Sequence, residues 1–211
     1  MMVIILLGIL GSTFLMVMAK RMPALIRSFC YQSFFLFLII FITAFKENRL
    51  DLYVVAGLIF ALKVLVIPYF LSSTATKIKV SESLGLFINS QLSLIIALVL
   101  TYFSWMFSKN LGFTGEYFSG IAITVAFSQV FIGAFLMISR MKAFTQVIGL
   151  LVMENGIFLL GVSIEEGMPF FVEIAIFFDV FVSVIVMGLF VYRINKLFTH
   201  IDVNRLSRLK G

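Results

Sequence analysis

Seven long apolar stretches, separated by short polar segments, fill this 211-residue chain. A water-soluble domain has too little interior to bury so many apolar side chains, whereas a multi-spanning membrane protein places them against lipid. The composition agrees, because 62% of the residues are hydrophobic, 12% are charged and the mean hydropathy is +1.16. The stretches do not alternate in polarity as the strands of a membrane barrel would. The sequence therefore predicts an all-α, multi-spanning membrane helix bundle.

Seven transmembrane helices are predicted, at about 3–19, 28–45, 51–71, 84–107, 117–139, 143–163 and 169–192. At a rise of about 1.5 Å per residue, helices of these lengths can cross a hydrocarbon core of roughly 30 Å, the first two being the shortest. The polar stretch 108–116 is the best divider of the chain. It separates an N-terminal four-helix membrane half (1–111) from a C-terminal three-helix half (112–200), which a polar tail (201–211) follows.

The distribution of charge predicts the orientation of these helices. Loops on one side and the tail collect twelve of the sixteen basic residues: Lys20, Arg21, Arg27, Lys77, Lys79, Arg140, Lys142, Arg193, Lys196, Arg205, Arg208 and Lys210. The positive-inside rule then places the N-terminus outside and the C-terminus in the cytoplasm, as in a multi-pass protein of the inner (cytoplasmic) membrane. Because topology accounts for the basic excess, no nucleic-acid partner is expected.

Catalytic groups are scarce in this sequence. Cys30 is the only cysteine and His200 the only histidine, too few for the chain alone to hold an iron–sulfur cluster, a bis-histidine haem or a zinc site. No nucleophile–base pair or phosphate-binding loop stands out. The sequence therefore predicts a non-catalytic membrane subunit with no cofactor and no metal of its own.

Three ionisable residues lie near the midpoints of predicted helices: Lys63, Glu154 and Asp179. The helical rise puts all three within roughly 3 Å of one plane, and Glu173 lies roughly 9 Å nearer the outer face. A central Lys or Asp costs about 2.5–3.5 kcal/mol to insert, so these side chains should face the bundle interior or a wet cavity. This arrangement makes them the candidate proton-transfer residues.

Two interpretations of this plane stay open. In the first, a fixed lysine–carboxylate pair joins two helices. In the second, burial raises the pKa of a carboxyl and lowers that of a lysine until both exchange protons near neutrality. The presence of two acids in the plane and a third outside it favours the proton relay. Gln129 and Asn155 would support a polar path, although each also fits a simple interhelical hydrogen bond.

Pro68 lies five residues after Lys63 in the third predicted helix. It lacks an N–H, so a carbonyl near Val64 loses its helical partner. The proline predicts either a polar gap at membrane depth or an ordinary kink.

Several motifs resemble component E of hydrogenase 4, from the membrane arms of formate-hydrogenlyase-type nickel–iron hydrogenase complexes. They are KVLVIP (63–68), QVIGLLVMENGIFL (146–159), VEIAIFFDVFVSVIVM (172–187) and IDVNRLSRLKG (201–211). The resemblance implies antiporter-like membrane subunits and a nickel–iron hydrogenase module with iron–sulfur subunits as partners. This chain would then contribute to a proton translocation path, while the redox chemistry takes place in those partners.

The C-terminal three helices also resemble the small K-type subunit of respiratory complex I, in which two membrane-embedded glutamates transfer protons. Asp179 looks like the counterpart of the second glutamate. Leu151 stands at the place of the first, and Glu154 follows almost one turn later, about 4.5 Å along the helix. Two alternative functions remain beside the hydrogenase one: a subunit of a cation/proton antiporter, or a structural spacer in the membrane arm.

Overall fold

The computed structural model describes residues 1–48, 50–77, 88–110, 117–140 and 142–163. The regular structure in these ranges is helical. In chain order it comprises α1 (Met2–Met18), α2 (Met22–Glu47), α3 (Leu50–Ile59), the π-helix η1 (Phe60–Val66), α4 (Ile67–Lys77), α5 (Ser90–Asn110), α6 (Tyr117–Ser139) and α7 (Ala143–Ser163). The predicted all-α class is confirmed for this part of the chain.

Five helical segments here are long and apolar enough to cross a membrane: Met22–Glu47, Leu50–Ser73, Ser90–Asn110, Gly120–Ser139 and Thr145–Ser163. The second of these runs without a break from α3 through η1 into α4. The apolar helix α1, with 17 residues, is shorter. The predicted seventh helix (169–192) and the tail lie outside the described residues, and the orientation of the termini stays a prediction.

The predicted start of the second helix, at residue 28, is wrong. Helix α2 begins six residues earlier, at Met22, and Pro23 occupies its first turn. Proline suits that position because its fixed φ matches the helix and its missing N–H would have no helical partner there. Arg27 is exposed, whereas Leu25 and Ile26 beside it are buried. The basic side chain of Arg27 is typical of a loop, but here it lies on the exposed face of the helix.

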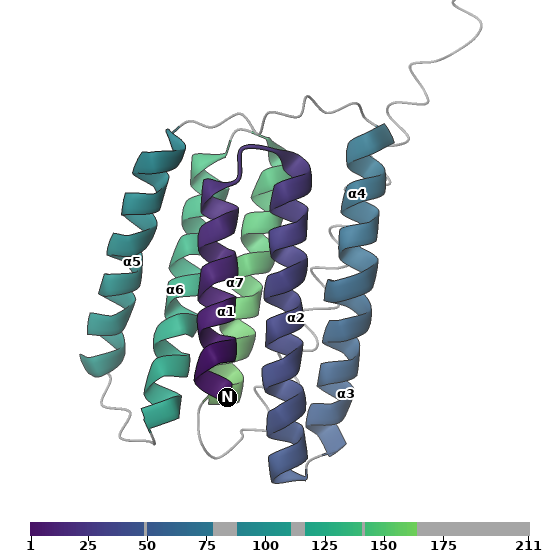
Figure 1. Ribbon diagram of the computed structural model, residues 1–211, viewed down its shortest axis with the longest axis vertical. Helices are drawn as coiled ribbons and strands as arrows, with labels where there is room; N and C mark the ends of the chain where they lie inside the picture. The colour runs from purple at the N-terminus through teal and green to yellow at the C-terminus, as the bar shows by residue number, and fades with distance from the viewer. Residues whose placement is uncertain (49, 78–87, 111–116, 141, 164–211) are drawn as a thin grey trace, which may run out of the picture.

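The helices lie side by side as an up-and-down bundle (Figure 1). Helix α1 packs against α2, α5 and α6, and α7 packs against α6 and α2. Helix α5 therefore forms one edge of the bundle, and the continuous segment α3–η1–α4 forms the other (Figure 1). Successive spans run antiparallel (Figure 1), as the sequence predicted for the pair on either side of 140–142.

Three glycines, Gly133 of α6 and Gly149 and Gly156 of α7, allow the two helices to pack at backbone contact. A Cβ on Gly133 of α6 would lie 2.6 Å from the backbone N of Met153, and one on Gly156 of α7 would lie 2.7 Å from the carbonyl O of Ala126. Only glycine permits such an approach, as in other small-residue helix interfaces. This contact fixes which face of α7 meets α6, and therefore which residues of α7 face the rest of the bundle.

Arg140, in the turn between α6 and α7, is a buried residue that caps α1. Its guanidinium donates hydrogen bonds to the carbonyls of Val17 (3.0 Å), Met16 (3.2 Å) and Ala19 (3.4 Å). A helix C-terminus has unpaired carbonyls and a partial negative charge, so a cation suits this place. Burial lowers the pKa of Arg140 to about 10, which still leaves it protonated at neutral pH. This residue, counted as a loop charge from the sequence, thus joins α1 to the α6–α7 turn.

Candidate functional site at mid-depth in the bundle

A polar layer crosses the bundle at mid-depth, between two apolar core clusters. One cluster lies toward the α1–α2 turn and includes Met16, Phe29, Ile67, Ile132 and Val152. The other lies toward the start of α1 and includes Leu6, Leu36, Ile59, Val125 and Phe158. Helices α1, α2, η1, α6 and α7 each contribute buried polar residues to this layer: Ser12, Thr13, Gln32, Ser33, Lys63, Ser128, Gln129, Glu154 and Asn155.

Lys63 enters this layer from the π-helix η1. The N–H of Ile67 donates to the carbonyl of Leu62, five residues earlier, which is the wider π spacing. Such turns are rare and are frequently found at functional sites. The nearby Pro68 has no N–H to offer the carbonyl of Val64, and the Cys30 thiol donates to that oxygen instead, at 3.6 Å. The carbonyl predicted to lose its helical partner is thus met by α2 within an irregular helix.

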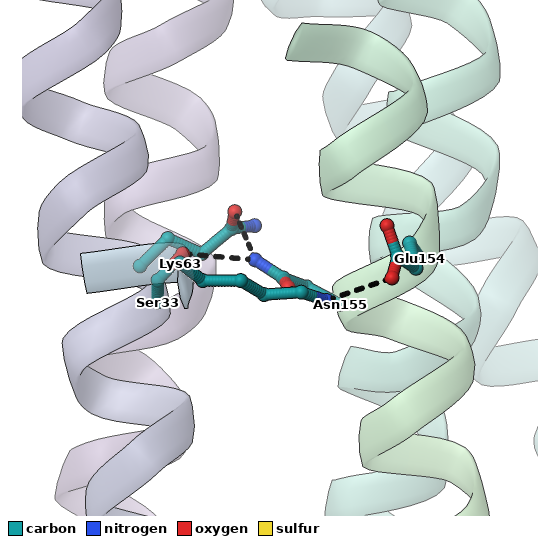
Figure 2. Close-up of polar contacts among 5 residues, drawn as sticks. Ser33, Lys63, Glu154 and Asn155 are labelled. Carbon is teal, nitrogen blue, oxygen red and sulfur yellow. Dashed lines mark hydrogen bonds and ion pairs between the residues drawn. The ribbon is translucent and has the colours of Figure 1, made fainter. Parts of the chain in front are cut away.

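The Lys63 ammonium contacts two consecutive residues of α7. Its Nζ lies 3.2 Å from Glu154 Oε1 and donates a hydrogen bond to Asn155 Oδ1 at 3.0 Å (Figure 2). It also lies 4.9 Å from the centre of the Phe158 ring, whose face attracts a cation. Lys63 is 0% and Glu154 1% exposed. Two of the three residues predicted to share a plane, Lys63 and Glu154, are therefore in direct contact between η1 and α7.

From Asn155, hydrogen bonds continue across the bundle to α1. Asn155 Nδ2 donates to Gln32 Oε1 (3.2 Å) and to Ser33 Oγ (3.3 Å) on α2. Gln32 Nε2 donates to Thr13 Oγ1 at 2.9 Å, and Thr13 donates to the Ile9 carbonyl within its own helix, also at 2.9 Å. The side chain of Lys63 is thereby linked through α7 and α2 to α1.

The predicted residues fall into three groups. Lys63, Glu154 and Asn155 lie together. Gln129 is fully buried in the same layer, but neither of its side-chain polar atoms has a hydrogen-bond partner in the described part of the chain. Asp179 and Glu173 lie outside the described residues, so their place in a relay stays a prediction.

Sequence reasoning missed Thr13, Gln32 and Ser33. Hydroxyl and amide residues are common in membrane helices and carry no charge to mark them. One signal was available. Gln32 and Ser33 lie near the middle of α2, and counting from the helix ends therefore puts them at the same depth as Lys63. Applying the same argument to uncharged polar residues would have found them.

The arrangement offers two kinds of chemistry. Glu154 and Lys63 can each gain or lose a proton and are within direct contact distance. The amides of Asn155 and Gln32 have fixed donors and acceptors and do not titrate, so they orient and stabilise without exchanging protons. The site therefore combines one buried acid–base pair with a neutral hydrogen-bonded support.

Comparison with known proteins gives a partial match. Over 90 residues, the chain is similar to hydrogenase-4 component E. The Escherichia coli and Shigella flexneri proteins are each 34% identical to it, and the match covers 43% of this chain and 42% of theirs. An uncharacterized protein of Mycobacterium tuberculosis is 26% identical over 204 residues, which cover 96% of this chain and 93% of that protein.

No protein-family model matches the chain, and no solved structure matches it. The resemblance to component E seen in the sequence motifs is thus supported over part of the chain. The resemblance of the C-terminal helices to the complex I K-type subunit stays a prediction.

Proposed function

We propose that this chain is an integral membrane subunit of a complex-I-like hydrogenase complex and contributes to its proton translocation path. The single observation that carries the proposal is the Lys63–Glu154 pair, buried at mid-depth between η1 and α7. Ionisable groups inside a membrane bundle are costly and rare, and they mark ion pathways and proton relays. The π-helix that carries Lys63 supports the same conclusion.

The partners in this proposal come from the similarity to hydrogenase-4 component E. They are antiporter-like membrane subunits and a nickel–iron hydrogenase module with iron–sulfur subunits, which hold the metals and perform the electron transfer. This chain is then a non-catalytic, multi-pass subunit of the inner membrane. Redox-driven changes in its neighbours alter the hydration around Glu154, which takes up a proton and passes it on, with Asp179 and Glu173 as further stations.

The test is proton pumping coupled to hydrogen turnover in inverted membrane vesicles that carry the whole complex. Glu154→Gln and Asp179→Asn should leave the complex assembled and hydrogen turnover active, but should reduce pumping several-fold. Glu47→Gln is the matched control, since it makes the same chemical change at an exposed position near the end of α2. Unchanged pumping in a fully assembled Glu154→Gln/Asp179→Asn double variant would reject the relay.

A structural spacer is the second candidate, and the 3.2 Å contact between Lys63 and Glu154 favours it, because a fixed pair would also join the third span to α7. In that case, Glu154→Gln lowers the amount of assembled complex, while the complex that remains pumps normally. Purification in mild detergent separates both candidates from a cation/proton antiporter, because an antiporter subunit would bring no nickel–iron protein with it.

A further inference from the structure

Gln129 of α6 is the exception among the uncharged side chains of the polar layer. It is 0% exposed, yet neither its Nε2 nor its Oε1 has a hydrogen-bond partner in the described part of the chain. Each of the other uncharged side chains of the layer makes at least one hydrogen bond: Ser12, Thr13, Gln32, Ser33, Ser128 and Asn155. The amide of Gln129 therefore requires a partner of another kind.

Packing between α6 and α7 holds this side chain inside the bundle. A Cβ on Gly156 would lie 2.9 Å from Gln129 Cβ and 2.9 Å from the backbone N of Val130, so this part of α6 lies directly against α7. Because Gln129 is fully buried, its amide reaches neither lipid nor the water at the ends of the bundle. A buried amide without hydrogen bonds costs free energy, and the bilayer core supplies no solvent to compensate.

The hydroxyl residues of α6 avoid this cost within their own helix. Ser128 Oγ donates to the Thr124 carbonyl at 2.7 Å, and Thr124 Oγ1 donates to the Gly120 carbonyl at 2.9 Å. Such short side chains can reach the carbonyl four residues back. The Gln129 amide makes no such bond within the described part of the chain, so its partner must lie beyond its own helix.

The chemistry of the amide indicates which partner fits. Its nitrogen has two N–H donors and its oxygen has two acceptor positions, and both ends need a partner. A carboxylate only accepts and an ammonium only donates, so one charged side chain can satisfy only one end. Water donates and accepts, and buried waters typically make about three hydrogen bonds to polar groups that have no other partner.

We propose that the Gln129 amide binds an internal water molecule on the α6 side of the polar layer. The water accepts a hydrogen bond from Nε2 and donates one to Oε1. This site does not depend on the proposed function, because the buried amide needs the same partner in a structural spacer. The proposed function nevertheless requires water in this layer, and Gln129 is the side chain that holds it.

The test is solid-state nuclear magnetic resonance of the full-length, isotope-labelled chain in lipid bilayers, with magnetisation transferred from water protons. The signal of the Gln129 side-chain nitrogen should build up several-fold faster than that of the Ile132 backbone nitrogen. Ile132 lies three residues further along α6, is fully buried and belongs to an apolar core cluster. The exposed Gln91 side chain near the start of α5 gives the upper reference.

The Gln129 signal is identified by its loss in Gln129→Met. If that variant does not fold, sequential assignment from the backbone of Val130 identifies the same signal in the unaltered chain. Ser128→Ala is the matched control, since it removes a buried hydroxyl, one residue away, that bonds to its own helix. It should leave the transfer from water to Gln129 unchanged.

A Gln129 signal that builds up no faster than that of Ile132 overturns the proposal, because the amide then has no water within reach. A contact between the Gln129 amide and a side chain outside the described residues, in place of the transfer from water, overturns it as well.

Discussion

Replacing Gly133 with alanine would test whether the contact between α6 and α7 sets the geometry of the site. The added Cβ would lie 2.6 Å from the backbone N of Met153 and 2.8 Å from the carbonyl O of Gly149. Ordinary van der Waals contact begins at 3.4 Å, so the helices must separate locally by 0.8 Å, the difference between 3.4 and 2.6 Å. Because both obstructing atoms belong to the backbone, no change of rotamer can relieve the clash.

The expected loss can be estimated from two opposing terms. Overpacking a close contact costs about 1–3 kcal/mol, and a clash with backbone lies at the upper end of this range. Alanine gains about 1 kcal/mol over glycine as a helix former. The free energy of unfolding of Gly133→Ala should therefore fall by about 2 kcal/mol. A Cβ at Gly120 of α6 or at Gly161 of α7 would meet no atom within 4 Å. Gly120→Ala and Gly161→Ala should therefore gain the helix preference of alanine without the cost of overpacking.

The assay is unfolding of the purified chain in mixed micelles of a mild detergent and sodium dodecyl sulfate, followed by circular dichroism. Gly133→Ala should unfold at a lower fraction of sodium dodecyl sulfate than the original chain, and both control variants at an equal or higher one. Equal stability of Gly133→Ala and Gly120→Ala would refute the reasoning, because the two helices would then not be in backbone contact at Gly133.

Two further predictions concern the helix ends and the irregular third span. Arg140→Met should lower the free energy of unfolding by about 2–4 kcal/mol in the same assay, since three carbonyls at the C-terminal end of α1 lose a charged donor. The loss should be equal at about pH 6 and about pH 8, because a pKa of about 10 leaves Arg140 protonated at both; a loss that differs between them contradicts this assignment. Pro68→Ala should raise the free energy of unfolding by about 0.5–1.5 kcal/mol, since it offers the Val64 carbonyl a backbone N–H, which is a stronger donor than the Cys30 thiol. No gain would mean that the Cys30 thiol already satisfies that oxygen.

Part of the candidate site could be predicted because membrane depth follows directly from position in the chain. A helix rises by a constant amount per residue, so counting from the ends of two spans was enough to bring Lys63 and Glu154 to one level. Depth alone does not tell which way a side chain points from its helix. Asn155 was expected to belong to a supporting path, yet it accepts a hydrogen bond from Lys63 directly, whereas Gln129 makes no hydrogen bond within the described part of the chain.

The ends of the helices were harder to predict than their existence. Apolar length identifies a span, but the start of α2 depends on how the chain leaves α1 and on Pro23 in the first turn. Arg140 shows the same limit, since a basic residue in a short loop usually meets water. Its burial results from the position of the α1 C-terminus beside the α6–α7 turn, a contact between residues more than 120 positions apart.

The sequence by itself determined the membrane-type helical architecture and the depth of the buried charges, because apolar length and helical rise are local properties of each segment. Only the tertiary structure decided which side chains meet at that depth. Rotation of each helix about its axis is set by packing, here by Gly133 and Gly156 between α6 and α7 and by the π turn around Lys63. These contacts direct Lys63 to both Glu154 and Asn155, and they connect the pair to Gln32 and Thr13, which no charge marks in the sequence.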